Sequence, residues 1–110
     1  MKISTWNVNS INARISHLEK FILKDKSDIY LLQELKTIEE GFPKDILKKL
    51  GYYSYVNGQK AWNGVAILSK TKLAITNSSI PKFDDPNSRI IETEIKLKKI
   101  KKKIKLINIY

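Results

Sequence analysis

Residues 2–33, KISTWNVNSINARISHLEKFILKDKSDIYLLQ, decide the fold class, because the spacing of their apolar residues changes twice. Lys2 to Val8 alternates between polar and apolar residues, which is typical of a strand. Ser10 to Lys24 then carries apolar residues at helical spacing, with Ser10 placed to cap the helix. Asp28 to Gln33 is a short apolar run, typical of a strand covered on both faces. This order predicts a crossover unit with parallel strands, and therefore an α/β protein.

The remainder of the chain predicts a mixed sheet. Pro43 to Leu50 has a short helical pattern, which Gly51 is suited to end. Apolar or alternating runs between turn residues predict five further strands: Tyr52 to Val56, Gly64 to Ser69, Leu73 to Thr76, Arg89 to Leu97 and Ile104 to Ile109. Residues 77–88, which include two prolines, predict a loop. The lysines within residues 98–103 are expected at a solvated hairpin tip.

The composition excludes several classes of protein. Its 110 residues are 42% hydrophobic and 29% charged, the balance of one globular domain. The absence of cysteine excludes disulfide scaffolds, zinc–thiolate sites and cysteine nucleophiles. The one histidine, His17, cannot form a histidine-rich metal site and is expected to be an ordinary helix residue. No apolar run is long enough to span a membrane, and the N-terminus does not resemble a signal peptide, so we expect a cytoplasmic protein without membrane contact.

The formal charge of +10 favours binding to polyanions such as nucleic acids. It comes from 21 Lys and Arg against 11 Asp and Glu, and all but two of the cations are lysines. Isoleucine is also abundant, and an AT-rich coding sequence would supply both lysine and isoleucine. The charge alone therefore does not identify a nucleic-acid-binding protein.

Asn7 and Glu34 are the candidate residues that the spacing brings together. Each follows or ends a predicted parallel strand, and the carboxyl ends of such strands are where open α/β sheets place their ligands. A carboxylate and an amide suit a hard cation such as Mg²⁺. An ordinary surface glutamate beside a turn-forming asparagine would have the same spacing, so the pattern leaves both readings open.

Five stretches of the sequence, in order, resemble the bacterial exonuclease III family. The resemblance covers essentially the whole chain and rests on Met1 to Asn9 with Ala13-Arg14, Asp28 to Lys36, Leu50 to Tyr52, Gly58 to Lys60 with Asn63 to Lys70, and Arg89 to Ile95 with Ile107 to Tyr110. One departure is Leu35, where the family usually has threonine. The resemblance implies the endonuclease/exonuclease/phosphatase fold, a four-layer α/β sandwich of two sheets with helices outside.

The resemblance also implies an activity and site residues. Its members cut DNA at abasic sites and remove nucleotides from 3′ ends with Mg²⁺ or Mn²⁺, so double-stranded DNA is the expected partner. It implies that Glu34 is a metal ligand, that Asn7 lies beside the metal, and that Tyr110 approaches the scissile phosphate. Further positions become candidates for DNA contact: Asn9, Lys60, Trp62, Asn63 and Arg89. Packing across its own hairpin is an equal alternative for Trp62, as is an ion pair for Arg89.

The resemblance implies further catalytic residues that this sequence does not contain: an Asp-x-Asn segment, a later aspartate and a Ser-Asp-His ending. The chain also stops in an apolar strand, whereas a domain usually ends in a polar tail. We therefore expect residues 1–110 to be the N-terminal part of one such domain, inactive alone, and a separately encoded C-terminal half is a candidate partner.

Two alternatives compete with a nuclease fragment. One is a non-catalytic basic module or relic that binds nucleic acid through its lysines. The other keeps the fold but acts on phosphoinositides or sphingomyelin. The Gly58 to Lys60 and Asn63 to Ala66 stretches resemble the DNA-repair branch, which ranks the last alternative lowest.

Overall fold

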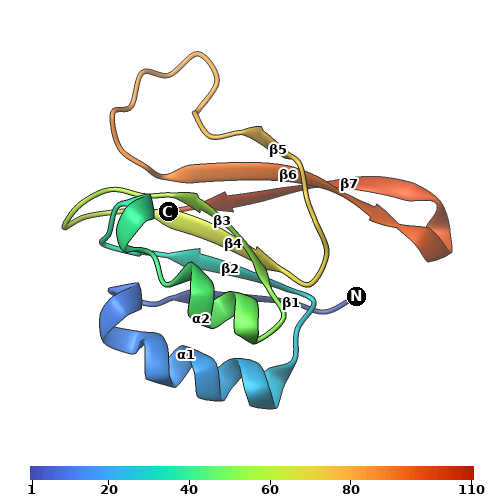
Figure 1. Ribbon diagram of the computed structural model, residues 1–110. Coiled ribbons are helices and arrows are strands. Elements are labelled where there is room, and N and C mark those ends of the chain that lie inside the picture. Colours follow the sequence, from blue (N-terminus) through green and yellow to red (C-terminus); the bar gives the residue numbers. More distant parts are fainter.

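Two β-sheets lie face to face in the computed structural model, which describes residues 1–110 (Figure 1). The first sheet has the order β1-β2-β4-β3, with bounds Ile3–Asn7, Ile29–Gln33, Val65–Ser69 and Tyr53–Asn57. The second has the order β5-β6-β7, with bounds Ile75–Asn77, Ile90–Leu97 and Lys102–Ile109. Two α-helices, α1 (Ile11–Asp25) and α2 (Lys44–Lys49), cover the far face of the first sheet. Short 3-10 turns lie at Glu39–Gly41, before α2, and at Lys98–Ile100, between β6 and β7.

The β1-α1-β2 unit confirms the prediction from residues 2–33. β1 and β2 are parallel, with Asn7 beside Gln33 at their carboxyl ends. Ser10 caps α1, because its Oγ accepts a hydrogen bond from the Ala13 amide at 3.4 Å. Lys26 ends the helix in the left-handed conformation. The helix therefore begins at the residue that the sequence predicts as its cap.

The other strands complete a mixed sheet and an antiparallel one. β4 pairs antiparallel with both β2 and β3, and β6 pairs antiparallel with β5 and β7. The strand expected at Leu73 to Thr76 lies instead at Ile75–Asn77. The Leu73 amide donates to the Tyr55 hydroxyl at 2.7 Å, and its side chain packs between the sheets, so this residue belongs to the crossover between them.

The first sheet separates two apolar clusters. Twelve buried residues from the sheet and the helices form the helix-side cluster. Five buried residues form the cluster between the sheets: Ile29, Val65, Ile67, Ile91 and Ile95. All of β4 is buried, because it is covered on both faces. The chain thus forms three layers, helices, sheet and sheet, in keeping with the expected half of a four-layer sandwich.

Neither helix is long and apolar enough to cross a membrane.

Candidate active site

Asn7 and Glu34 meet at the edge of the first sheet where β1 and β2 end. The Asn7 side-chain amide donates a hydrogen bond to Glu34 Oε1 at 2.8 Å. The parallel pairing places both residues there, because Asn7 ends β1 and Glu34 follows the last residue of β2. The contact expected from the strand spacing is therefore present.

The Glu34 backbone is held in an uncommon conformation. Its φ of 53° lies in the left-handed region, as do those of Asn9, Ser10, Lys36 and Asn63 around it. Such conformations cost free energy and persist only where surrounding contacts fix them. Here the Glu34 carbonyl accepts from the Ser10 amide at 2.8 Å, and the Lys36 amide donates to the Asn63 carbonyl at 3.0 Å. Segments from both sides thus fix the direction of the Glu34 side chain.

Gly64 permits this close approach of two loops. Its φ is +90°, and a Cβ added there would lie 3.0 Å from the Cβ of Leu35. The Leu35 amide also donates to the Gly64 carbonyl at 3.1 Å. A side chain at position 64 would push the segment that carries Glu34.

The charge environment keeps Glu34 ionised. The hydrogen bond from Asn7 lowers the pKa of the carboxyl group, and the neighbouring Tyr110 hydroxyl and Lys36 ammonium lower it further. The Lys36 ammonium lies 3.6 Å from Glu34 Oε2 and donates to Asn9 Oδ1 at 2.6 Å. The Asn9 amide in turn donates to Asn7 Oδ1 at 3.1 Å. Asn7, Asn9, Glu34 and Lys36 therefore form one polar cluster.

Tyr110 joins this cluster from β7 of the second sheet. Its hydroxyl is close enough to Glu34 for that carboxylate to raise the pKa of Tyr110. The Tyr110 hydroxyl thus remains protonated at neutral pH and can act as a hydrogen-bond donor.

Arg89 holds the tyrosine. Its guanidinium lies 5.6 Å from the centre of the Tyr110 ring, and it donates to the Tyr110 carbonyl at 3.3 Å. It also forms an ion pair with Asp85 at 3.3 Å. The structure therefore gives Arg89 the ion pair that was one of its two expected roles.

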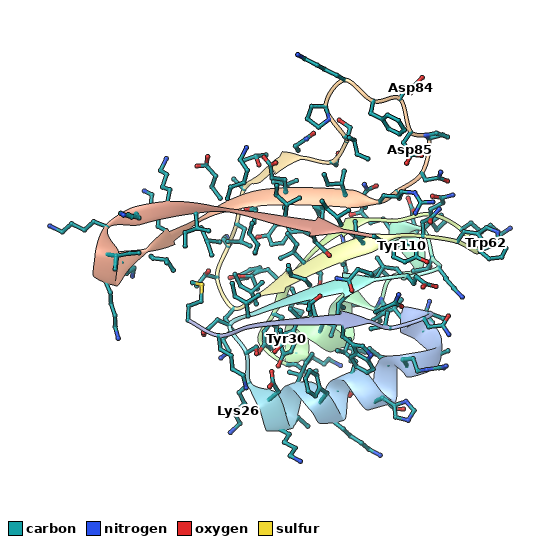
Figure 2. The ribbon with its side chains drawn as sticks, turned by 180° about the vertical axis from the view of Figure 1, so that it is seen from behind. Lys26, Tyr30, Trp62, Asp84, Asp85 and Tyr110 are labelled. Carbon is teal, nitrogen blue, oxygen red and sulfur yellow. The ribbon has the colours of Figure 1, made fainter.

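The loop of residues 58–64 carries three of the remaining candidates, of which Asn63 is buried and Lys60 and Trp62 are exposed. Asn63 is 9% exposed, and its amide donates to Gln59 and Asn87, both at 3.2 Å. Trp62 is 69% exposed and does not pack across its hairpin, and Lys60 is exposed beside it. Figure 2 shows Trp62 and Tyr110 at the same end of the molecule.

Three residues of this edge were not singled out from the sequence. Lys36 contacts Glu34, and Gln33 and Asn108 lie behind it. Gln33 Nε2 donates to Asn108 Oδ1 at 2.7 Å, and the buried Asn108 amide donates to the carbonyls of Leu32 and Ala66 at 2.9 and 2.8 Å. Lys36 could have been found from its place two residues after Glu34. Asn108 gives no signal in the sequence, because its partners are in other strands.

The residues at this edge could supply one protein ligand, the Glu34 carboxylate, to a divalent cation. Glu34 is the one carboxylate of the cluster, and no group of three His, Cys, Asp or Glu side chains in the chain could hold a metal alone. The Asn7 side-chain oxygen already accepts a hydrogen bond from the backbone amide of Asn9, so the role of Asn7 is to orient Glu34 through its side-chain NH₂ group. Mg²⁺ is often held by one or two carboxylates, with water and substrate phosphate completing the shell. Glu34 fits that pattern. His17 is exposed on α1 and does not belong to this cluster.

Comparison with known proteins identifies relatives over most of the chain. A model of the Endonuclease/Exonuclease/phosphatase family matches residues 4–106. Exodeoxyribonuclease III of Haemophilus influenzae is 36% identical over 96 residues, which are 86% of this chain and 36% of that protein.

Solved structures give the same result. A 3′ phosphatase from Neisseria bound to a product DNA hairpin superposes with a TM-score of 0.89 at 36% identity, over 100% of this chain and 41% of that one. An AP endonuclease from Archaeoglobus fulgidus superposes with a TM-score of 0.74 at 34% identity, over 86% of this chain and 37% of that one. The chain therefore spans well under half the length of these relatives.

Proposed function

This chain belongs to the endonuclease/exonuclease/phosphatase family, and from that premise we propose that its Glu34 site serves Mg²⁺-dependent hydrolysis of phosphodiester bonds in DNA. One observation carries the proposal: Asn7 and Glu34 are joined by a hydrogen bond, and the Tyr110 hydroxyl, from a third segment, lies beside the same carboxylate. A carboxylate whose pKa is lowered, next to a neutral hydroxyl donor, suits an anionic phosphate held through a cation.

Each residue has a distinct role in this proposal. Glu34 would hold Mg²⁺, with Mn²⁺ as a substitute, and Asn7 fixes the orientation of its carboxylate. The bound cation supplies charge stabilisation for an in-line displacement at phosphorus. Tyr110 donates its proton in a hydrogen bond to a phosphate oxygen, and Arg89 fixes the Tyr110 ring.

We propose duplex DNA as the substrate, with abasic sites and 3′ ends as the positions attacked. The family relatives support this choice, since they include an exodeoxyribonuclease III, a 3′ phosphatase with product DNA, and an AP endonuclease. The exposed Trp62, with Lys60 and Asn9 on the same side, would contact the backbone or an unpaired base. Arg89 and Asn63 would support this surface from behind.

Residues 1–110 form part of a catalytic domain in this proposal. The Glu34 cluster has one carboxylate, without a second acid or a histidine to activate water. Loss of groups that act as a unit typically lowers the rate by several orders of magnitude. We therefore expect the chain to need residues from another polypeptide segment, and to be nearly inactive without them.

The test uses a duplex with one abasic site, in Mg²⁺ and in chelator. The chain is assayed alone and mixed with the segment of the Haemophilus influenzae relative that follows the matched region. We expect little cleavage by the chain alone and Mg²⁺-dependent cleavage by the mixture. Glu34→Gln should abolish the latter, whereas the exposed control Glu40→Gln should not. Cleavage that survives Glu34→Gln, or rapid cleavage by the chain alone, would contradict the proposal.

A second candidate function is non-catalytic binding of nucleic acid, favoured by the charge of +10. It predicts affinity that falls steeply with salt and does not distinguish an abasic duplex from an intact one. A preference for the abasic duplex that depends on Trp62 would favour the nuclease instead.

A further inference from the structure

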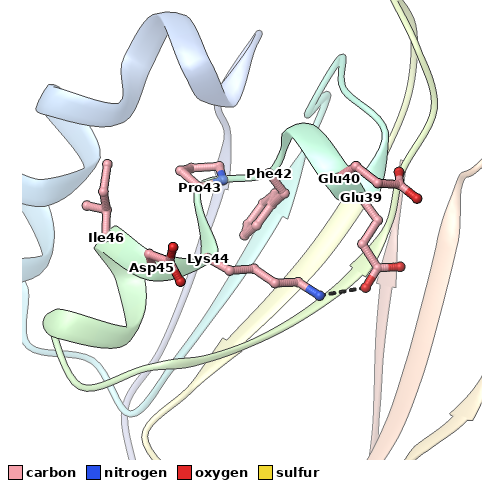
Figure 3. A pocket seen from close by; sticks show the side chains of 7 residues that line it. All are labelled: Glu39, Glu40, Phe42, Pro43, Lys44, Asp45 and Ile46. Atoms are coloured by element: carbon pink, nitrogen blue, oxygen red, sulfur yellow. Dashed lines mark hydrogen bonds and ion pairs between the residues drawn. The ribbon is translucent and has the colours of Figure 1, made fainter.

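Two of the surface hollows outside the Glu34 cluster are candidates for a further site. One, of about 650 Å³, lies around Glu39 to Ile46 and is rich in carboxylates (Figure 3). Lys44 already bonds Glu39 there, and nothing else marks a ligand. The other is a cleft of about 750 Å³ between Lys70 to Ala74 and Glu94 to Ile100. Met1 also lines it, and Figure 1 shows the N-terminus and the β6–β7 tip at the end of the molecule opposite the C-terminus.

The floor of this cleft is apolar. Seven of its sixteen lining residues are hydrophobic, and they include Ile29, Leu73, Ile95, Leu97 and Ile100. Ile29 and Ile95 belong to the cluster between the sheets, so the cleft opens directly onto the core. Ile100 is 55% exposed at its rim. A ligand that fills the cleft would therefore bring apolar groups.

One wall of the cleft is a strand edge without a partner. β5 pairs with β6 only at Thr93 and Glu92, so Glu94 to Leu97 has β7 on one side and no strand on the other. The chain before β5 does not extend the ladder, because the Leu73 amide donates to the Tyr55 hydroxyl instead. Backbone groups of an open edge bind an added extended segment.

The rim of the cleft is positively charged. It holds five lysines, Lys70, Lys72, Lys96, Lys98 and Lys99, against two acids. Both acids are already engaged: Asp28 accepts from the Lys2 amide at 2.7 Å, and Glu94 lies 3.6 Å from Lys103. Lys96, Lys98 and Lys99 have no ion-pair partner in the chain. Their charges are therefore free for an anionic ligand.

We propose that this cleft binds an extended peptide segment of a partner protein, one that alternates apolar and acidic residues and adds as a strand beside Glu94 to Leu97. Alternate side chains of a strand point to opposite faces, so apolar groups would enter the cleft while acidic groups meet the lysines. Nucleic acid fits the floor less well, because no aromatic side chain lines the cleft for a base to stack on.

The test measures fluorescence anisotropy of labelled octapeptides with the full chain. The probe alternates aspartate and leucine. Three competitors separate the contributions: an aspartate–serine peptide, the probe with alternate backbone amides methylated, and a single-stranded oligonucleotide. We expect the aspartate–serine and the methylated peptides each to bind about tenfold more weakly than the probe, through loss of apolar burial and of backbone hydrogen bonds.

Matched variants locate the site. Lys96→Glu, Lys98→Glu and Lys99→Glu together should weaken binding of the probe at least about tenfold. The same charge change at the exposed helix residues Lys20, Lys24 and Lys49 should weaken it no more than about twofold. Ile100→Ser, at an exposed position, should weaken the leucine peptide and not the serine one.

Several results would overturn the proposal. The absence of probe binding would do so, as would equal weakening by the two lysine triples. Indifference to backbone methylation would exclude strand addition. Tighter binding of the oligonucleotide, lost in the Lys96, Lys98 and Lys99 variant, would assign the rim to nucleic acid instead.

Discussion

The two faces of the β1-β2-β4-β3 sheet are covered by buried clusters of different size and composition. The face toward α1 and α2 has a cluster of twelve buried residues, all hydrophobic or tyrosine. The face toward β5-β6-β7 has five buried apolar residues, and Thr93 and Asn108 are buried among the strands that cover it. The larger cluster supplies more apolar burial, while the polar contacts beside the smaller one reach the end of β2, next to Glu34.

This difference separates stability from positioning. Apolar burial is non-directional, so the helix side stabilises the fold without fixing where the strand ends lie. The hydrogen bonds of Asn108 reach Leu32, Gln33 and Ala66, beside the residue that bears the site carboxylate. A buried polar group that is fully satisfied specifies one arrangement, because any shift leaves it unpaired. The sheet side therefore contributes to the geometry of the Glu34 cluster through Gln33 and Asn108.

The largest expected effect is on the helix side. Leu32 is completely buried in the twelve-residue cluster. Leu32→Ala should lower the free energy of unfolding by about 3 kcal/mol, from lost burial and the cavity left behind. Urea denaturation measures it, with the 42% exposed Ile3→Ala as the control. Equal losses in the two variants would mean that this cluster does not dominate stability.

On the sheet side, Asn108→Leu should lower the free energy of unfolding less than Leu32→Ala does, but it should displace the residues of the Glu34 cluster more. It removes the donors to the Leu32 and Ala66 carbonyls and the acceptor for Gln33, for a loss of about 2 kcal/mol. The exposed Asn12→Leu, which loses one surface hydrogen bond, is the control. Chemical shifts of the Glu34 and Asn7 amides should move in Asn108→Leu and stay fixed in Leu32→Val. Movement in both variants would remove the proposed division between the two faces.

Gly64→Ala sharpens the comparison at the edge of the sheet. Both Gly64 and Gly51 have positive φ, but only at Gly64 would an added Cβ meet a neighbouring side chain, that of Leu35. Each alanine should cost about 1 kcal/mol for its conformation. Gly64→Ala should cost about 1 kcal/mol more, from overpacking against Leu35. Denaturant titrations of both variants measure the difference, and identical values would refute the steric account.

The smallest effect concerns Asp25, below the helix-side cluster. Its carboxyl accepts hydrogen bonds from Lys2 and Ser27, and then from Ser4 and Tyr30, which lower its pKa well below the usual range. A carboxyl group whose pKa is lower in the folded protein than in the unfolded chain stabilises the fold at neutral pH. That stabilisation is lost as the pH falls below the pKa of an aspartate in the unfolded chain, about 4. Wild-type thermal stability should therefore fall more steeply between pH 5 and 2, about the acid range of carboxyls, than that of Asp25→Asn.

Exposure limits the size of this effect, since Lys2 is 57% exposed. Asp45→Asn, on the exposed surface of α2, is the control and should follow the wild-type curve. Parallel curves for all three proteins would show that the Asp25 network does not contribute.

The strands and the meeting of Asn7 with Glu34 could be predicted from sequence, because both follow from local periodicity and parallel pairing. The expected mixed sheet and the capped helix after Ser10 are confirmed for the same reason. The position of β5 could not be predicted, because the Tyr55 hydroxyl, from a strand 18 residues away, takes the Leu73 amide. The burial of Asn63 depends likewise on Gln59 and Asn87 in two loops. The roles of the site residues in catalysis and DNA contact remain predictions.

The contact between Gln33 and Asn108 joins residues 75 positions apart in the chain. Asn7 and Glu34, at 27 positions, can come together as soon as the β1-α1-β2 unit forms. Contacts of long sequence separation carry a loop-closure cost that delays them in folding. The sheet edge that carries Asn7 and Glu34 should thus form in two stages, with these two residues paired early and fixed in place only when β7 docks. Mutations at Asn108 should then speed unfolding while leaving the refolding rate nearly unchanged, which stopped-flow measurements can test.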